Sequence, residues 1–142
     1  ARTGKEVWNF TSKEKISSSP VPAKQNVLVG SWDGNLYAVN MKSGELAFKF
    51  ETGGRITAAP TVSADTIYLS SHDGYLYALS AADGSLNWKF KTGNKIFATP
   101  MVMDGIVFVG SWDKTFYAID AATGGVKWKL AGAETYSISP AG

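Results

Sequence analysis

Short apolar runs separated by glycine-containing turns make up most of the chain. In the middle of the sequence, residues 66–71 form an apolar run of strand length that is rich in β-forming residues. Asp73-Gly74 then predicts a hairpin turn, because Gly readily takes the positive φ that such turns need. Residues 75–80 and 86–91 predict two further strands, the latter with alternating apolar and polar positions. With a first strand over residues 56–62, the pattern predicts four short strands in this part of the chain.

The same pattern returns every 40 residues without a gap. A Pro, a Gly, an aromatic residue and a Ser-x-Asp tripeptide followed by Tyr-Ala each recur at this spacing. The repeated positions are Pro20, Pro60, Pro100 and Pro140; Gly4, Gly44, Gly84 and Gly124; Trp8, Phe48, Trp88 and Trp128; Ser31-x-Asp33, Ser71-x-Asp73 and Ser111-x-Asp113; and Tyr37, Tyr77 and Tyr117. Four strands per repeat, with an aromatic residue in each, is the pattern of a β-propeller blade. A helical repeat would need long stretches with a period of about 3.6 residues, and the chain has none.

The predicted fold class is therefore all-β, with blades of four antiparallel strands. The repeat divides the chain into one partial propeller with a partial blade over residues 4–15, full blades over 16–55, 56–95 and 96–135, and a partial blade over 136–142. The first partial blade should supply a fourth strand over residues 5–11, and the last should supply a first strand near residues 137–140. Propellers have about 4–8 blades, so three full blades predict an incomplete ring. We expect a piece of a larger ring, a ring closed by copies of the chain, or a small arc carried on another chain.

A family resemblance rests on one stretch of the third repeat. Residues 121–130, Ala-Ala-Thr-Gly-Gly-Val-Lys-Trp-Lys-Leu, resemble the signature of the pyrroloquinoline-quinone (PQQ) type, or quinoprotein-like, β-propeller repeat: Ala, a turn Gly, and a Trp four residues after it. Residues 36–40 and 107–111 fit the same repeat, and the resemblance covers essentially the whole chain. It implies a ring of about seven or eight blades, of which this chain is less than half. It implies less about activity, because one fold hosts many functions.

The repeated aromatic and Asp residues are expected to be structural. In the resembled family the equivalent Trp packs between neighbouring blades, which assigns blade docking to Trp8, Phe48, Trp88 and Trp128. The repeated Asp residues should cap their turns through bonds to backbone N–H groups, and the repeated Tyr hydroxyls should be bonded locally.

Two substitutions break the repeat. Lys114 stands where the other hairpin turns have Gly34 and Gly74, so the third turn must change its type or accept strain. Pro22 stands where the next repeat has Val62, and it removes a backbone donor from a strand expected to be central. The first blade should be weaker for it, unless the missing N–H would point away from a partner. Such imperfect copies argue against an idealised design.

Two sets of equivalent positions are expected to gather on one face. In propellers of the resembled type, the loops after the second and fourth strands lie on the same side. One set is the variable residue of Ser-x-Asp, and the other is the basic residue before each first strand. The candidate partner-binding face consists of Trp32, His72, Trp112, Lys15, Arg55 and Lys95. Exposed Trp and Arg are typical interface anchors, so this face predicts an acidic or aromatic protein partner. The alternative is that the Trp rings lie flat on their own hairpins and the cations are solvated.

Composition narrows the possible functions. The net charge is +2, from 14 basic and 12 acidic residues, without the basic stripe that is typical of nucleic-acid binding. The absence of Cys excludes thiol chemistry and disulfides. No stretch approaches the roughly 18 apolar residues of a membrane helix. His72 is the only His and has no nearby ligand set in the sequence, so we predict no catalytic residue and no metal site.

Three functions remain open at this point. The favoured one is a non-catalytic scaffold for protein–protein contact, as the resemblance implies for members such as outer-membrane assembly lipoproteins, and it predicts an extracytoplasmic (periplasmic or cell-surface) location and no cofactor. The second is part of a PQQ-dependent dehydrogenase. For that class the resemblance implies PQQ, an adjacent Cys pair and Ca²⁺ ligands near a catalytic Asp, none of which can be placed on a motif here. The third is a self-assembling repeat module, natural or engineered, that forms a ring from its own copies.

Overall fold

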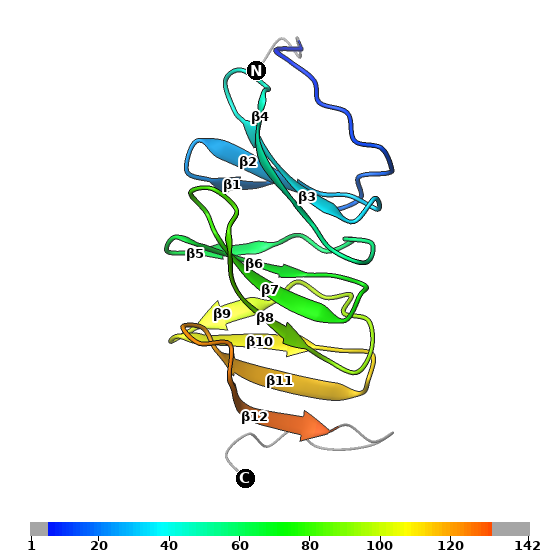
Figure 1. Ribbon diagram of the computed structural model, residues 1–142, viewed down its shortest axis with the longest axis vertical. Coiled ribbons are helices and arrows are strands. Elements are labelled where there is room, and N and C mark those ends of the chain that lie inside the picture. Colours follow the sequence, from blue (N-terminus) through cyan, green and yellow to red (C-terminus); the bar gives the residue numbers. More distant parts are fainter. Residues whose placement is uncertain (1–5, 132–142) are drawn as a thin grey trace.

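The computed structural model describes residues 6–131, and this part of the chain contains strands and no helix. Its strands form three four-stranded antiparallel sheets, in each of which consecutive strands pair in order (Figure 1). The first sheet holds β1 (Val21–Ala23), β2 (Asn26–Gly30), β3 (Asn35–Asn40) and β4 (Leu46–Glu51); the second holds β5 (Thr61–Ser63), β6 (Thr66–Ser70), β7 (Tyr75–Ser80) and β8 (Leu86–Lys91); the third holds β9 (Met101–Met103), β10 (Ile106–Gly110), β11 (Thr115–Asp120) and β12 (Val126–Ala131). The prediction of an all-β fold built from four-stranded propeller blades is confirmed.

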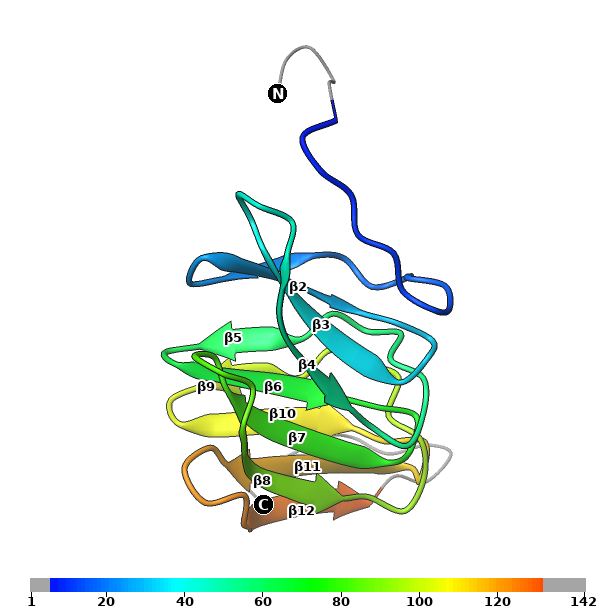
Figure 2. The same cartoon turned by 45° about the horizontal axis from the view of Figure 1, so that its top comes forward.

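The three sheets follow one another along the long axis of the molecule, and none closes into a ring (Figures 1 and 2). The hydrophobic core lies in two layers between neighbouring sheets. Leu36 and Ile67, from the first and second sheets, are fully buried in one layer. Leu76 and Val107, from the second and third sheets, are fully buried in the other. The sheets are therefore held together by the apolar faces that they turn toward each other.

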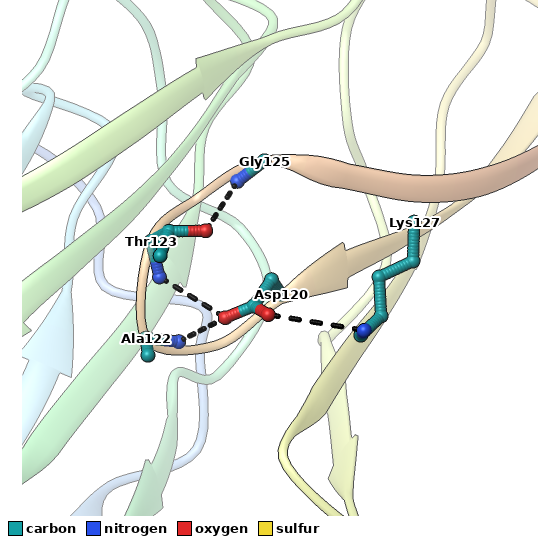
Figure 3. Close-up of polar contacts among 5 residues, drawn as sticks. All are labelled: Asp120, Ala122, Thr123, Gly125 and Lys127. Atoms are coloured by element: carbon teal, nitrogen blue, oxygen red, sulfur yellow. Dashed lines mark hydrogen bonds and ion pairs between the residues drawn. The ribbon is translucent and has the colours of Figure 1, made fainter.

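Short polar side chains fix the turns between the third and fourth strands. In the third sheet, Asp120 ends β11, and its Oδ1 accepts hydrogen bonds from the backbone N–H groups of Ala122 (2.8 Å) and Thr123 (3.1 Å). Thr123 Oγ1 accepts one from Gly125 N–H (3.2 Å), and Lys127 Nζ lies 3.9 Å from Asp120 Oδ2 (Figure 3). The N–H donors, that of Ala122 above all, stabilise the carboxylate and hold the pKa of Asp120 below its ordinary value.

Each Ser-x-Asp hairpin is tied to the preceding repeat by its Asp, as the third repeat illustrates. Asp113 Oδ1 accepts from Thr115 N–H (2.8 Å), and its Oδ2 accepts from the Tyr117 hydroxyl (2.5 Å) and from Gly93 N–H (2.8 Å) of the loop before. Burial raises the pKa of Asp113, but these donors, Tyr117 first, lower it below the ordinary value; burial and the Asp113 carboxylate raise the pKa of Tyr117 to about 12. Asp33 and Asp73 make the corresponding bonds. The predicted turn-capping by Asp and local bonding of Tyr are confirmed.

The repeated aromatic residues of the docking row, which we define as Trp8, Phe48 and Trp88, each pack on a Gly of the next repeat. A Cβ added to Gly44 or Gly124 would lie 2.7 Å from the ring of Trp8 or Trp88, and one on Gly84 would lie 2.3 Å from Phe48 Cδ1. Trp8 Nε1 donates to Met41 O (2.7 Å), and Trp88 Nε1 donates to Ala121 O (2.9 Å).

The fourth aromatic residue assigned to docking, Trp128, has no Gly of a following repeat against it among the described residues. It contacts Phe108 and Phe116 of its own sheet, with ring centroids 6.0 Å apart in both cases.

Two strands differ from their sequence-based prediction. Residues 6–11 form no strand, because a strand needs a bonded neighbour and these residues have none in the described part of the chain. The first strand of the second sheet is β5 (Thr61–Ser63) rather than residues 56–62. The reason is that Ile56 N–H donates to Ser31 O (3.1 Å) of the preceding repeat, so the chain still crosses between sheets at that point. The strand predicted near residues 137–140 lies outside the described residues.

The two broken repeat positions are also resolved. The strand that carries Pro22 is not central, as the sequence suggested, but is the edge strand β1, which pairs only with β2. An edge strand tolerates a Pro because its outer side needs no ladder donor. Lys114 keeps the turn type and accepts the strain, with a φ of 70° against 91° for Gly34 and 90° for Gly74. Its N–H donates to Ser111 O (3.1 Å), as the N–H of each Gly does to its own Ser.

Candidate functional site

Backbone bonds bring the two predicted sets of face residues together. In each repeat the N–H of the variable residue in Ser-x-Asp donates to the carbonyl of the basic residue before the first strand. These bonds are Trp32 N to Lys15 O (2.8 Å), His72 N to Arg55 O (2.9 Å) and Trp112 N to Lys95 O (2.9 Å). The six residues therefore lie as three adjacent pairs, one pair per sheet, on the side of the molecule where the second strands end.

Trp32 is the cation-covered member of the face. Lys15 Nζ lies 4.5 Å and Arg55 Cζ 4.4 Å from the centroid of its ring, both well within cation–π range. Its indole N–H donates to Ser17 Oγ (2.9 Å). Trp32 is half-buried, and its ring and its one polar atom are both engaged within the molecule.

His72 occupies the same position in the second repeat. Its Nε2 lies 3.0 Å from Thr57 Oγ1, and its ring lies on Phe97, with centroids 4.1 Å apart and an angle of 34° between the planes. Burial lowers the pKa of His72, and the charges of Lys95 and Arg55 lower it further. These effects favour the uncharged imidazole, which presents a flat ring to Phe97.

Trp112 ends this series of rings. It stacks on Phe97 with centroids 4.1 Å apart and planes inclined by only 14°. Since two rings cannot share one face of Phe97 at this distance, Phe97 lies between His72 and Trp112. Trp112 is 61% exposed, and its indole N–H meets no acceptor among residues 6–131.

We call Trp32, His72, Phe97 and Trp112 the aromatic row, and Lys15, Arg55 and Lys95 its flanking cations. All three cations are exposed. The ion pairs found within residues 6–131 are Lys24–Asp65 and Lys127–Asp120, so none of the flanking cations is neutralised by a carboxylate of the described chain. The face therefore combines flat apolar rings with positive charge that is available to a ligand.

Phe97 is the member of the row that the sequence did not identify. It stands two residues after Lys95, at the position where the other repeats have Ser17 and Thr57. This position varies from repeat to repeat just as the middle of Ser-x-Asp does, which is one signal that was available. A second signal was the spacing of two residues between Lys95 and Phe97, which places both side chains on the same side of an extended chain.

The described residues offer no ligand set for a metal ion. Within residues 6–131 no three His, Asp or Glu side chains gather closely enough to hold one. Asp33, Asp73 and Asp113, the carboxylates that recur in every repeat, already accept bonds from backbone N–H and Tyr hydroxyl groups. This part of the chain therefore does not fit the Ca²⁺ that accompanies PQQ in the dehydrogenase hypothesis. It also contains no helix that is long and apolar enough to cross a membrane.

Comparison with known proteins identifies relatives of this repeat. The sequence model of a family described as "Outer membrane protein assembly factor BamB" matches residues 1–95 and, in a second overlapping match, residues 51–141. No curated protein sequence matches the chain significantly.

Three solved structures illustrate how widely the fold is shared. BamB from Moraxella catarrhalis superposes with a TM-score of 0.75 at 21% identity, over 87% of this chain and 39% of BamB. Quinohemoprotein alcohol dehydrogenase from Comamonas testosteroni gives 0.71 at 21% identity, over 82% of this chain and 21% of the enzyme. The computationally designed Ika4 protein gives 0.82 at 19% identity, over 93% of this chain and 82% of the design. The chain thus spans well under half of the two natural proteins, and identities this low show the fold alone.

Proposed function

Since the chain belongs to the PQQ-type β-propeller repeat family, whose model is described as outer membrane protein assembly factor BamB, we propose that it is a non-catalytic scaffold that binds a protein partner through the aromatic row. The observation that carries the proposal is the row itself, with rings from three sheets on one face and three cations unpaired by described carboxylates. Trp and Arg are enriched among the residues that dominate binding energy at protein interfaces.

The charge of the face favours an acidic partner segment. Lys15, Arg55 and Lys95 stand at the same position of successive repeats, and the charged groups of Lys15 and Arg55 both lie against Trp32, while Lys95 is joined to Trp112 by a backbone bond. A segment that carries several carboxylates matches this positive charge, and complementary charge raises both the association rate and the specificity of such a contact. The description of the family as an outer-membrane assembly factor supports a protein partner and an extracytoplasmic location, in the periplasm or at the cell surface.

A comparison of two charge-reversed peptides tests the proposal. We expect a glutamate-rich peptide with blocked ends to change the tryptophan fluorescence of the protein, and a lysine-rich peptide of equal length to leave it unchanged. Binding should weaken as salt rises from about 20 mM to about 500 mM, because screening reduces exposed charge–charge attraction.

Two double variants, each lacking two positive charges, test whether the acidic peptide binds at this face. Arg55→Gln combined with Lys95→Gln should weaken binding of the acidic peptide about tenfold, as expected when two charge contacts of about 0.7 kcal/mol each are lost. Lys49→Gln combined with Lys129→Gln removes the same charge from exposed positions on β4 and β12, and it should have little effect. Equal binding of both peptides, or equal loss in both double variants, would overturn the proposal.

Further blades form part of the proposed working state. Propellers close with about 4–8 blades, whereas the described residues form three sheets in an open arc. Additional blades from a longer chain, or from copies of this one, are proposed to complete the ring. Light scattering over a range of concentrations tests the second source: a discrete closed oligomer supports self-closure, and a monomer at every concentration rules it out.

A further inference from the structure

The two Trp residues of the aromatic row stand two repeats apart at equivalent positions, but their rings are covered differently. The charged groups of Lys15 and Arg55 both contact the ring of Trp32, and its indole N–H donates to Ser17 Oγ. Trp112 has Phe97 on one side, is 61% exposed, and has no cation over its ring among the described residues. In the sequence, the position that corresponds to Arg55 one repeat beyond Trp112 is Thr135, which carries no charge. Within residues 6–131 the ring of Trp32 is therefore covered, whereas that of Trp112 is largely exposed.

The open end of the row is ready to accept one more flat group. His72, Phe97 and Trp112 already follow one another at centroid separations of 4.1 Å, so the next ring would add to a stack that is in place. Aromatic pairs in such an arrangement contribute beyond the apolar area that they bury. The indole N–H of Trp112, which meets no acceptor among residues 6–131, offers a hydrogen bond to the same ligand.

The positive charges near Trp112 favour some flat ligand groups over others. The backbone joins it directly to Lys95, and the exposed Lys114 lies on the same hairpin two residues later. A guanidinium group would stack well on indole, but it would approach two like charges here. An aromatic side chain flanked by carboxylates meets no such repulsion.

We propose that Trp112 is the anchoring position of the face: an aromatic side chain within the acidic partner segment stacks on its exposed ring, next in line after Phe97, and the neighbouring carboxylates of that segment meet Lys95 and Lys114. This inference rests on the proposed function and adds to it the residue type that the partner must carry and the place where it binds. Trp32, with its ring already covered, has no corresponding role.

Two blocked pentapeptides separate the aromatic contribution from the charge contribution. One has a central Phe between two pairs of Glu, and the other has Leu at the centre. We expect the Phe peptide to bind about three- to tenfold more tightly, the range typical of one aromatic pair. In a titration followed by nuclear magnetic resonance, the indole N–H signal of Trp112 should shift with the Phe peptide. The signal of Trp32, bonded to Ser17, should stay in place as an internal reference.

Variants at the open end provide the control. Trp112→Ala alone would uncover the ring of Phe97 as a second platform, so it is combined with Phe97→Thr, the residue found at the same position of the second repeat. The double variant should bind the Phe and Leu peptides equally, while it retains their dependence on salt. Trp32→Ala should keep the preference for Phe.

The outcomes distinguish the two proposals. If both Glu peptides bind with equal affinity to the unmodified protein, or if the double variant keeps the preference for Phe, the assignment of Trp112 is wrong while the acidic-partner proposal stands. If neither Glu peptide binds, both proposals fail.

Discussion

The docking row and the aromatic row differ in how far their residues vary from one repeat to the next. In the docking row nearly the same residue recurs, and each ring packs on a Gly of the next repeat. These contacts leave no room for a side chain at the Gly. The aromatic row has Trp32, His72 and Trp112 at one equivalent position, with Phe97 between the last two, and its rings are half-buried or exposed. In this protein the position that changes little from repeat to repeat lies at the contact between repeats, and the position that varies more lies where the side chain is at least partly exposed.

The freedom of the aromatic row has a physical origin. The hairpin that presents Trp32, His72 and Trp112 is held by their backbone N–H groups and by the Ser and Asp on either side, so its shape does not depend on the middle side chain. The docking row has no such freedom. At Gly84, for example, any side chain would collide with the ring of Phe48.

The largest expected effect lies in the docking row. Trp88→Ala should lower the free energy of unfolding by about 3–5 kcal/mol, because it leaves a cavity between two sheets and an unpaired carbonyl at Ala121. Urea unfolding followed by circular dichroism measures this change. If Trp32→Ala cost as much as Trp88→Ala, the contrast between the two rows would collapse.

The next effect concerns the Gly partners of the docking row. Gly84→Ala should cost about 2–4 kcal/mol, since it combines a positive φ of 78° with a contact 2.3 Å from Phe48. Gly105→Ala is the matched control, because Gly105 has a φ of 74° but no atom within 4 Å of an added Cβ. It should cost only the conformational part, about 1 kcal/mol. Equal costs in urea unfolding would mean that the Phe48 contact gives way freely.

The two ends of the aromatic row should differ in stability by a smaller amount. Trp32→Ala removes two cation–π contacts and one hydrogen bond and should cost about 2 kcal/mol. Trp112→Ala removes one aromatic stack from an exposed site and should cost about 1 kcal/mol or less. Thermal and urea unfolding of both variants measure the difference, and a reversed order would show that Trp112 is the better-packed residue.

A gain in stability is expected at the irregular turn. Lys114→Gly restores the residue that the other two hairpins use and relieves a left-handed backbone with a φ of 70°. We expect about 0.5–1 kcal/mol of stabilisation, since Gly takes this conformation without steric cost, although its freedom in the unfolded chain offsets part of the gain. A loss of stability would show that the Lys114 side chain makes a contact worth more than the strain.

The Asp–Tyr bonds are expected to have the smallest effect on how stability changes near neutral pH. Their contribution to the free energy of unfolding changes only at strongly acidic or alkaline pH. Folding raises the pKa of Tyr117 from 10.0 to about 12. Its contribution to the free energy of unfolding is therefore fully present below pH 10 and is lost as the pH rises through about 12. The lowered pKa of Asp113 has the opposite consequence: its contribution is present above the ordinary value of 3.8 and is lost as the pH falls below it. Phenolate absorbance should show late titration for Tyr37 and Tyr117, and Tyr117→Phe should remove one late step.

Most of the fold followed from the 40-residue period, because Gly, Asp and aromatic positions fix turns and seams locally. The third and fourth strands of the second sheet, residues 75–80 and 86–91, were predicted with their observed bounds. The first strand was predicted too long, since sequence does not show that residues near 56 bond across the seam before they reach their own sheet. Pro22 was misplaced for a similar reason, because the order of strands within a sheet is a tertiary property.

The candidate face was anticipated in its residues but not in its organisation. Equivalent positions identified Trp32, His72 and Trp112 with their basic neighbours. The contacts that distinguish them, two cations on Trp32 and the ring of Phe97 against Trp112, depend on side-chain conformations that repeat spacing does not encode.

The Asp bonds that tie each hairpin to the preceding loop bear on how fast the molecule folds. They join residues only 20 apart in sequence, the Trp indole bonds of the docking row join residues 33 apart, and the bond from Thr61 to Pro100 spans 39. Each seam is thus closed by a loop no longer than about one repeat, which keeps the contact order low for an all-β protein and favours rapid, stepwise growth from any formed pair of sheets. The same locality means that a unit of 40 residues inserted or deleted at a seam would alter the length of the array while leaving the interior of every other sheet as it is.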